Sequence, residues 1–344
     1  MAGLVALARR LSFRDLAALV PLAAERDVLD PTAGGRVQRL CSFGQRLLDL
    51  DAEDFGKVYP EVAPATDVPK PSAAIGTVVP PDLVRRAAAC RVPQKPDDTE
   101  RGILTSLRPA YRLLLEVANA RWRRREMLWF LATVHIASEY APLLAWEPIL
   151  GHAGDPARLA AQFRIAGSRW GAIDDPACPH IRAYKAAANR SLRVSTENME
   201  GWTSYLDRQQ STVAQALAYC SVTCGHTCTV VTRLSEEEQR DLRRRNRLAV
   251  AFAGSALVRL RHSAPVGHGF GVPSPAEVYE AWTRTRTSLA RIAPEIETDD
   301  GVDSPGPVLR NLFSALAGTP ITPDTLVAEA ADAAVVELER GFRG

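Results

Sequence analysis

The sequence predicts an all-α fold, a multi-helix bundle of about ten helices with an irregular, proline-rich segment near the N-terminus. Apolar residues recur at helical spacing along most of the 344-residue chain. Helix-capping sequences precede several of these stretches. Only two short segments, 75–79 and 228–232, have the clustered β-branched residues that are typical of strands.

Capping residues place the starts and ends of the expected helices. Thr322 is expected to cap the last helix, and Gly341 is expected to end it. Three capping boxes predict further helix starts: Ser12 with Asp15, Ser235 with Glu238, and Ser274 with Glu277. The apolar spacing predicts helices over residues 36–50, 82–90, 109–150 with a break near Pro142, 157–166, 178–190, 195–224, 235 to about 262, 305–317 and 323–340.

Proline distribution suggests the domain organisation. Eight prolines lie between residues 60 and 96, and such a density is typical of an irregular segment. We expect residues 1–97 to form a helical appendage that continues into this proline-rich linker. Residues 98–344 are expected to form the helical core domain that carries the functional site.

Composition excludes two classes of protein. The chain is 46% apolar and 24% charged, with a net charge of +2, so it is neither a disordered tail nor a strongly basic nucleic-acid-binding protein. Arginine clusters at 121–125 and 240–247 are offset by acidic runs at 236–238 and 299–300. Solvated helix faces are therefore favoured over a phosphate-binding surface, and nucleic acid is not an expected partner.

The expected location follows from the absence of two signals in the sequence. No apolar run reaches the ~18 residues needed to cross a bilayer. The first ten residues place their apolar part before their charges, which is the reverse of a secretory signal. We expect a cytoplasmic protein without a membrane partner, and the abundance of Ala, Arg and Pro favours a GC-rich bacterial genome.

A cysteine cluster is the first candidate site. Cys220, Cys224 and Cys228 follow one another at intervals of four residues, with His226 inside the run. On a helix they form one stripe, and cysteine among Ala, Val and Thr is most often a small buried hydrophobe. The alternatives are redox chemistry and a zinc or iron–sulfur site built from these four residues.

Two histidines are the second candidate site. His135 lies in an apolar helical stretch, and Glu139 follows one turn later on the same face. His262 ends a predicted helix and precedes a glycine-rich loop. Taken singly, the first is typical of a core histidine paired with a carboxylate, and the second of a histidine at the negative end of a helix dipole.

Taken together, the two histidines resemble those of the heme enzymes related to tryptophan 2,3-dioxygenase, a superfamily that includes heme-dependent tyrosine hydroxylases. In the dioxygenases, the histidine on the distal side of the heme lies between Glu-x-Leu-Phe and Glu-Leu-Trp sequences. The similar residues here are Glu126-Met127-Leu128-Trp129, His135 and Glu139-Tyr140. The proximal ligand of that family follows a Trp-Arg-Phe-Arg-His sequence. The similar residues here are Val258-Arg259-Leu260-Arg261-His262.

The resemblance implies an all-α heme b enzyme that inserts oxygen from O2 or H2O2 into an aromatic amino acid or a derivative of one. His262 would ligate the heme iron, and His135 would be the catalytic residue on the other side. Arg259 and Arg261 would pair with the heme propionates. The loop that would bind the substrate consists of Gly267, His268, Gly269, Phe270 and Gly271.

Three departures from the family are visible in the sequence. Its Gly-Thr-Gly-Gly loop is not reproduced, and no clear match to its carboxylate-binding arginine segment is found. Val266 stands where some relatives carry a heme-linked cysteine, so no thioether is expected there. The rival readings are a non-catalytic helical interaction protein and the metal or iron–sulfur protein built on the cysteine cluster. The sequence is also compatible with assembly into a homo-oligomer.

Overall fold

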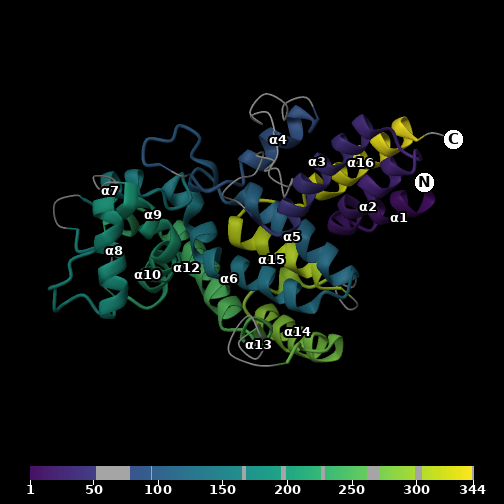
Figure 1. The fold of residues 1–344 in the computed structure, drawn as a ribbon. Helices are drawn as coiled ribbons and strands as arrows, with labels where there is room; N and C mark the ends of the chain where they lie inside the picture. Colours follow the sequence, from purple (N-terminus) through teal and green to yellow (C-terminus); the bar gives the residue numbers. More distant parts are fainter. Residues whose placement is uncertain are drawn as a thin grey trace. The chain divides into compact units, whose positions relative to one another are not determined.

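The computed structural model describes residues 1–51, 78–93, 95–164, 168–194, 199–225, 229–261, 271–298 and 304–342. Within these ranges the chain is helical, and the β contact found there is an isolated bridge between Leu29 and Phe342 (Figure 1). The all-α class is therefore confirmed, although the α-helices outnumber the ten that were expected.

The helices, in chain order, are α1 (Ala2–Arg9), α2 (Phe13–Glu25), α3 (Pro31–Leu48), α4 (Pro81–Ala88), α5 (Arg108–Arg123), α6 (Met127–Leu150), α7 (Pro156–Phe163), α8 (Arg182–Arg193), α9 (Met199–Arg208), α10 (Gln210–Val222), α11 (Thr229–Thr232), α12 (Glu236–Ala253), α13 (Ala256–Leu260), α14 (Pro275–Ala290), α15 (Pro305–Ala317) and α16 (Leu326–Gly341). Two short 3-10 turns, η3 (Gly102–Leu104) and η6 (Pro294–Ile296), lie between them.

The chain divides into two compact units. Unit 1 comprises residues 1–92 and 324–344, and unit 2 comprises residues 93–323. The division at residue 92 lies close to the boundary expected at residue 97. The C-terminal segment, however, groups with the N-terminal helices rather than with the core that precedes it in the sequence.

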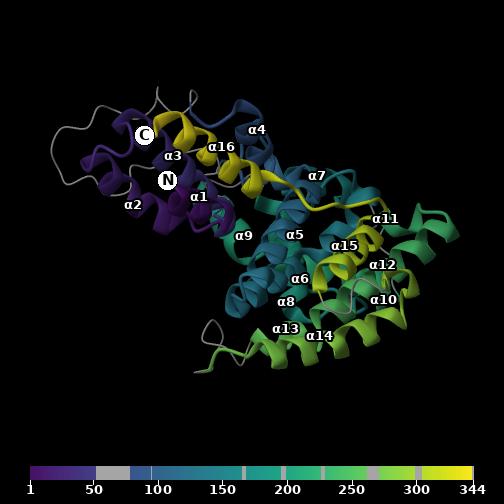
Figure 2. The same ribbon diagram turned by 90° about the vertical axis from the view of Figure 1, so that its right-hand side faces the viewer.

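Unit 1 is built on α3, which packs against α2 and α16. Figures 1 and 2 both show α16 lying alongside α3. Two glycines allow this close packing: a Cβ at Gly44 would lie 2.5 Å from the ring of Phe13, and one at Gly341 would collide with Ala33. Only a residue without a side chain fits where two helices approach so closely.

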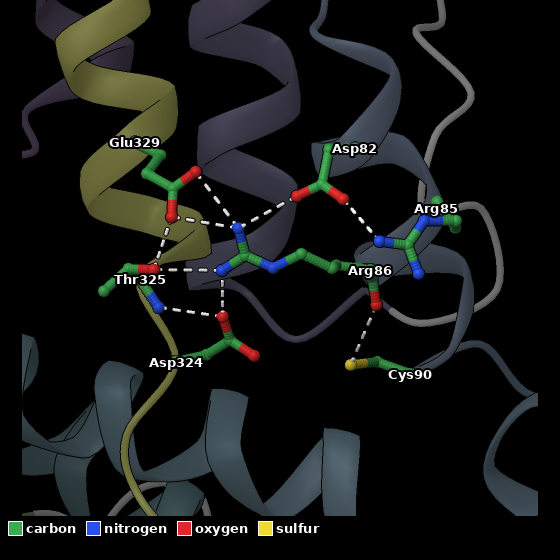
Figure 3. Close-up of polar contacts among 7 residues, drawn as sticks. All are labelled: Asp82, Arg85, Arg86, Cys90, Asp324, Thr325 and Glu329. Atoms are coloured by element: carbon green, nitrogen blue, oxygen red, sulfur yellow. Dashed lines mark hydrogen bonds and ion pairs between the residues drawn. The ribbon is translucent and has the colours of Figure 1, made fainter.

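Arg86 of α4 joins that helix to the start of α16 (Figure 3). Its guanidinium lies 2.9 and 3.0 Å from the two carboxylate oxygens of Glu329 and also contacts Asp324. It donates a further hydrogen bond of 2.9 Å to Thr325. Burial would lower the pKa of Arg86, but the hydrogen bonds to Asp324 and Glu329 outweigh it, so the pKa is raised. Asp324 is buried, and Arg86 neutralises it.

We expect Arg86→Met to loosen α16, because the substitution removes the guanidinium that contacts the buried Asp324 carboxylate. A lost partner of this kind costs about 2 kcal/mol, which is roughly a 30-fold change in a local opening constant. Amide hydrogen exchange in α4 and α16 measures it. Arg85→Met is the matched control, because the ion pair of Arg85 with Asp82 is exposed and is worth less than about 1 kcal/mol. Equal exchange in the two variants would show that the cluster does not hold α16.

Unit 2 is arranged around α6, against which α5, α10, α12, α13 and α15 pack (Figures 1 and 2). Its buried residues include Phe130, Leu143 and Trp146 and are distributed over every side of the helix. By length and composition α6 also meets the criteria for a membrane span, which corrects the expectation that no apolar stretch is long enough. However, 61% of its most apolar stretch is buried inside the protein, as in the core helix of a globular fold.

The expected helix break near Pro142 is wrong. Pro142 and Pro148 both lie inside α6, and the chain breaks at Arg125 instead. Arg125 has a left-handed φ of 57°, and its N–H and that of Glu126 bond to the carbonyls of Trp122 and Arg121. This is a Schellman ending with arginine in place of the usual glycine. A helical proline costs about 3 kcal/mol, which the burial of several large side chains at roughly 2 kcal/mol each outweighs.

Other predicted helix boundaries also differ from the observed ones. The helix predicted from 235 to 262 divides after Ala253, because the Ser255 side chain accepts from Val258 N and starts α13. The stretch 195–224 contains two helices, α9 and α10, and residues 229–232 of the strand-like segment are helical. Ser12 makes no capping hydrogen bond, and α16 begins three residues beyond the expected Thr322 cap region. The capping boxes at Ser235 and Ser274 are confirmed.

His152 is a buried histidine that follows α6 and links that region to α7. Its Nδ1 accepts a hydrogen bond of 2.9 Å from the N–H of Asp155, and its Nε2 lies 2.8 Å from Oε1 of Gln162. The ring must therefore be neutral, with its proton on Nε2. Burial lowers the pKa of His152, and the charge of Arg158 acts in the same direction.

We expect His152 to destabilise unit 2 in acid. Because its pKa is lower in the folded than in the unfolded chain, the unfolded state binds more protons below about pH 6.5, and stability falls there. His152→Asn keeps a donor and an acceptor but cannot titrate. Its free energy of unfolding should depend less steeply on pH, by up to about 1.4 kcal/mol per pH unit. Urea unfolding followed by tryptophan fluorescence suits the measurement, since all six tryptophans belong to unit 2. Parallel pH curves would contradict the assignment.

Candidate functional site

Tertiary structure brings together His135 and Arg261, two residues of unit 2 that lie far apart in the sequence. His135 lies in the middle of α6, and Arg261 directly follows α13. Nη1 of Arg261 is 2.5 Å from Nε2 of His135, across 126 residues of sequence. Glu139, one turn along α6, places its Oε1 3.2 Å from the same nitrogen. The His135 side chain is 16% exposed, so the group lies at the edge of the core.

Arg261 and Glu139 make opposite demands on Nε2 of His135. A guanidinium can only donate a hydrogen bond, so the Arg261 contact requires a lone pair on Nε2 and a neutral ring. An ionised carboxylate can only accept, so Glu139 requires a proton on that nitrogen. The shorter distance belongs to Arg261. We therefore assign the neutral ring with its proton on Nδ1 to this arrangement, and the Glu139 hydrogen bond to the protonated ring.

The charges around His135 also act on Glu139. The pKa of the Glu139 carboxyl is lowered. The hydrogen bond with His135 and the charge of that ring act when the imidazole is protonated, burial opposes them, and the charge of Arg261 acts in both forms. The carboxyl is accordingly ionised at neutral pH. It supplies the negative charge that keeps the Arg261 guanidinium at this edge of α6 even when the imidazole is neutral.

The structure describes only some of the other residues that were predicted for the heme site. Arg259, two residues before Arg261, is exposed to solvent, and so is Gly271. Of the two arginines assigned to the heme propionates, only Arg261 thus lies beside the catalytic candidate. His262, Gly267, His268, Gly269 and Phe270 lie outside the described residues.

Two further residues, Cys178 and His180, lie next to the cysteine cluster, although the cysteine spacing did not predict them. Sγ of Cys220, near the end of α10, is 3.1 Å from Nε2 of His180. On the other edge of that ring, Nδ1 is 3.2 Å from Sγ of Cys178. Cys224 lines the same cavity as Cys178 and His180. The Cys-x-His spacing of residues 178 and 180 was the signal in the sequence that could have indicated this pairing.

The positions of these residues bear on the hypothesis that the cysteine cluster binds a metal ion. Among the described residues, no group of three Cys, His, Asp or Glu side chains is placed to hold one ion. Cys178 and Cys220 face different nitrogens of His180, and an imidazole ligates an ion through one nitrogen. The predicted ligands His226 and Cys228 lie outside the described residues, so the four-residue site remains a hypothesis.

Comparisons with protein-family models, with curated proteins and with solved structures found no match to this chain.

We expect the Nε2 atom of His135 to carry no proton at pH 8 in the intact protein. In Arg261→Met the competing donor is absent, so the proton should move to Nε2 and bond to Glu139. Side-chain 15N spectra of histidine-labelled protein distinguish the two tautomers. Arg259→Met is the matched control, because it removes an exposed arginine two residues away. If Nε2 is already protonated in the unsubstituted protein, the contact with Arg261 is not the dominant one.

Proposed function

We propose that this protein is a heme-dependent oxygenase or peroxygenase acting on an aromatic amino acid or a derivative. The contact between Arg261 and His135 carries the proposal. It joins the two short segments whose sequences resemble the heme dioxygenases, although 126 residues separate them. The side chain that reaches His135 belongs to the direct chain neighbour of His262, the proposed iron ligand.

The described residues are of the chemical types that a heme site uses. His135 is a neutral imidazole next to a guanidinium, and the latter pairs well with a propionate carboxylate. Arg261 would hold such a carboxylate, while Arg259, being exposed, would contribute less. His262 would supply the axial nitrogen, and the apolar α6 would supply one wall of the site. When bound, heme supplies the oxidising power for the reaction with O2 or H2O2.

The role proposed for His135 depends on what Arg261 does. While the guanidinium donates to Nε2, the imidazole cannot act as a base, because its lone pair is occupied. If Arg261 turns to a carboxylate instead, Nε2 of His135 becomes able to accept a proton from a substrate hydroxyl or amine. Glu139 would then stabilise the resulting imidazolium, since its carboxylate lies 3.2 Å away.

Titration with hemin tests the proposal. We expect the purified chain to bind hemin with a strong Soret band, and His262→Ala to lose or shift that band. His268→Ala is the matched control, because it removes a histidine of the same loop and should leave the band in place. His135→Ala should also keep the band while turnover of aromatic amino acids with H2O2 falls by at least about 100-fold, the usual contribution of a general base.

A protein that takes up no hemin would overturn the proposal. A band that survives in His262→Ala but disappears in His268→Ala would overturn the assignment of the ligand. In the first case the rival hypothesis, a non-catalytic helical interaction protein, would be preferred.

A further inference from the structure

His180 is held in one tautomer by its surroundings in unit 2. Its Nε2 lies 3.2 Å from the carbonyl oxygen of Ala216 in α10. A carbonyl can only accept, and Sγ of Cys220, 3.1 Å from the same Nε2, can accept as well, so we assign the ring proton to Nε2 and the lone pair to Nδ1. That lone pair faces Sγ of Cys178 at 3.2 Å and accepts its S–H. The ring of Tyr219 packs at 4.7 Å from the imidazole and restricts its rotation.

The arrangement is that of an activated nucleophile. A thiol donates to an imidazole nitrogen, and a third group orients the imidazole through its other nitrogen. Burial lowers the pKa of His180 despite the opposing hydrogen bond to Ala216, and the charge of Lys185 adds to the decrease. The ring is therefore neutral near pH 7, and its Nδ1 is available as a base for the Cys178 thiol.

Charged side chains line the same cavity. Lys185 and Arg169 are both in its wall, so two positive charges line the cavity that Cys178 also lines. The acidic group that faces them is Asp175, whose backbone oxygen accepts from Lys185 at 2.9 Å and whose carboxylate is 3.5 Å from Arg169. The positive charges in this wall thus exceed the negative ones. Cys178 is also only partly buried, unlike Cys41 and Cys90.

The cavity is small. Its volume is about 20 Å³, and Trp170, Gly171 and Tyr184 complete its wall. A cavity of this size holds roughly one water molecule. A peptide, an acyl group or glutathione cannot reach the sulfur through it without displacing the wall, whereas a diatomic-sized electrophile can.

We propose that Cys178 is a peroxide-reactive thiol, activated by His180 and selective for hydrogen peroxide over larger hydroperoxides. Nδ1 of His180 accepts the thiol proton as the sulfur attacks one peroxide oxygen. An S–O bond forms and the O–O bond breaks. The departing oxygen leaves as hydroxide and takes the proton back from the imidazole as water. The sulfur is oxidised to sulfenic acid, and the peroxide is reduced. This inference does not rest on the proposed heme site.

In the test, the whole folded chain is treated with hydrogen peroxide, the peroxide is removed, and the chain is then unfolded in dimedone, which traps sulfenic acids, and analysed by peptide mass spectrometry. Cys41 is the internal control, because burial raises its pKa to about 12 and keeps it a thiol. We expect Cys178 to be labelled at least about tenfold faster than Cys41. A disulfide that includes Cys178 counts equally, since it forms when a second thiol attacks the sulfenic acid and releases water.

Two variants and a second oxidant distinguish activation of Cys178 by His180 from simple solvent exposure of its thiol. His180→Gln removes the base and should slow labelling of Cys178 about tenfold. Lys185→Gln leaves the packed imidazole in place and should slow it several-fold by removing a charge. Replacing hydrogen peroxide by tert-butyl hydroperoxide should slow Cys178 far more than it slows free cysteine. Labelling of Cys178 no faster than of Cys41 would overturn the proposal, and so would equal rates with the two oxidants.

Discussion

The fold of unit 2 depends on burying a helix that has no polar face. The 24 residues of α6 present apolar side chains in every direction, so a single neighbour cannot cover them. Five other helices pack around α6, and two hydrogen bonds connect α6 to α5 and to the residue before it. The Tyr111 hydroxyl donates to the carbonyl of Ala137 at 2.6 Å, and Glu147 accepts from the N–H of Leu107 at 2.9 Å, next to the start of α5. Burial then explains why two prolines do not interrupt α6.

The described histidines of unit 2 share one physical state. His135, His152 and His180 each accept a hydrogen bond at one ring nitrogen, from Arg261, from the N–H of Asp155 and from Cys178 respectively. Each acceptor contact requires a neutral ring, because an imidazolium has no lone pair. The donors differ in kind, and so do the consequences. A backbone N–H cannot leave and makes His152 structural, whereas a guanidinium can turn away and a thiol can react.

Unit 1 is held by a different combination of forces. Its helices approach so closely at Gly44 and Gly341 that dispersion contacts extend to the backbone. Arg86 adds a charged connection in which three carboxylates converge on one guanidinium, as Figure 3 shows. The planar guanidinium suits such a cluster because it offers five donors in fixed directions. The cluster connects residues more than 230 positions apart, which places the C-terminal helix in the unit that begins the chain.

The amino-acid sequence was sufficient to predict the helical class, most of the helices and the capping boxes at Ser235 and Ser274, because these follow from spacing and from side chains within one turn. It did not locate the break at Arg125, since a left-handed arginine is stabilised by its neighbours and carries no glycine signal. It also paired His135 with His262 only through a resemblance. Tertiary structure alone decided that Arg261 reaches His135, that Cys178 and His180 join Cys220, and that α16 belongs to unit 1. The contacts of Arg261 with His135 and of Cys220 with His180 span 126 and 40 residues, and no local pattern encodes which distant side chain fills a given space.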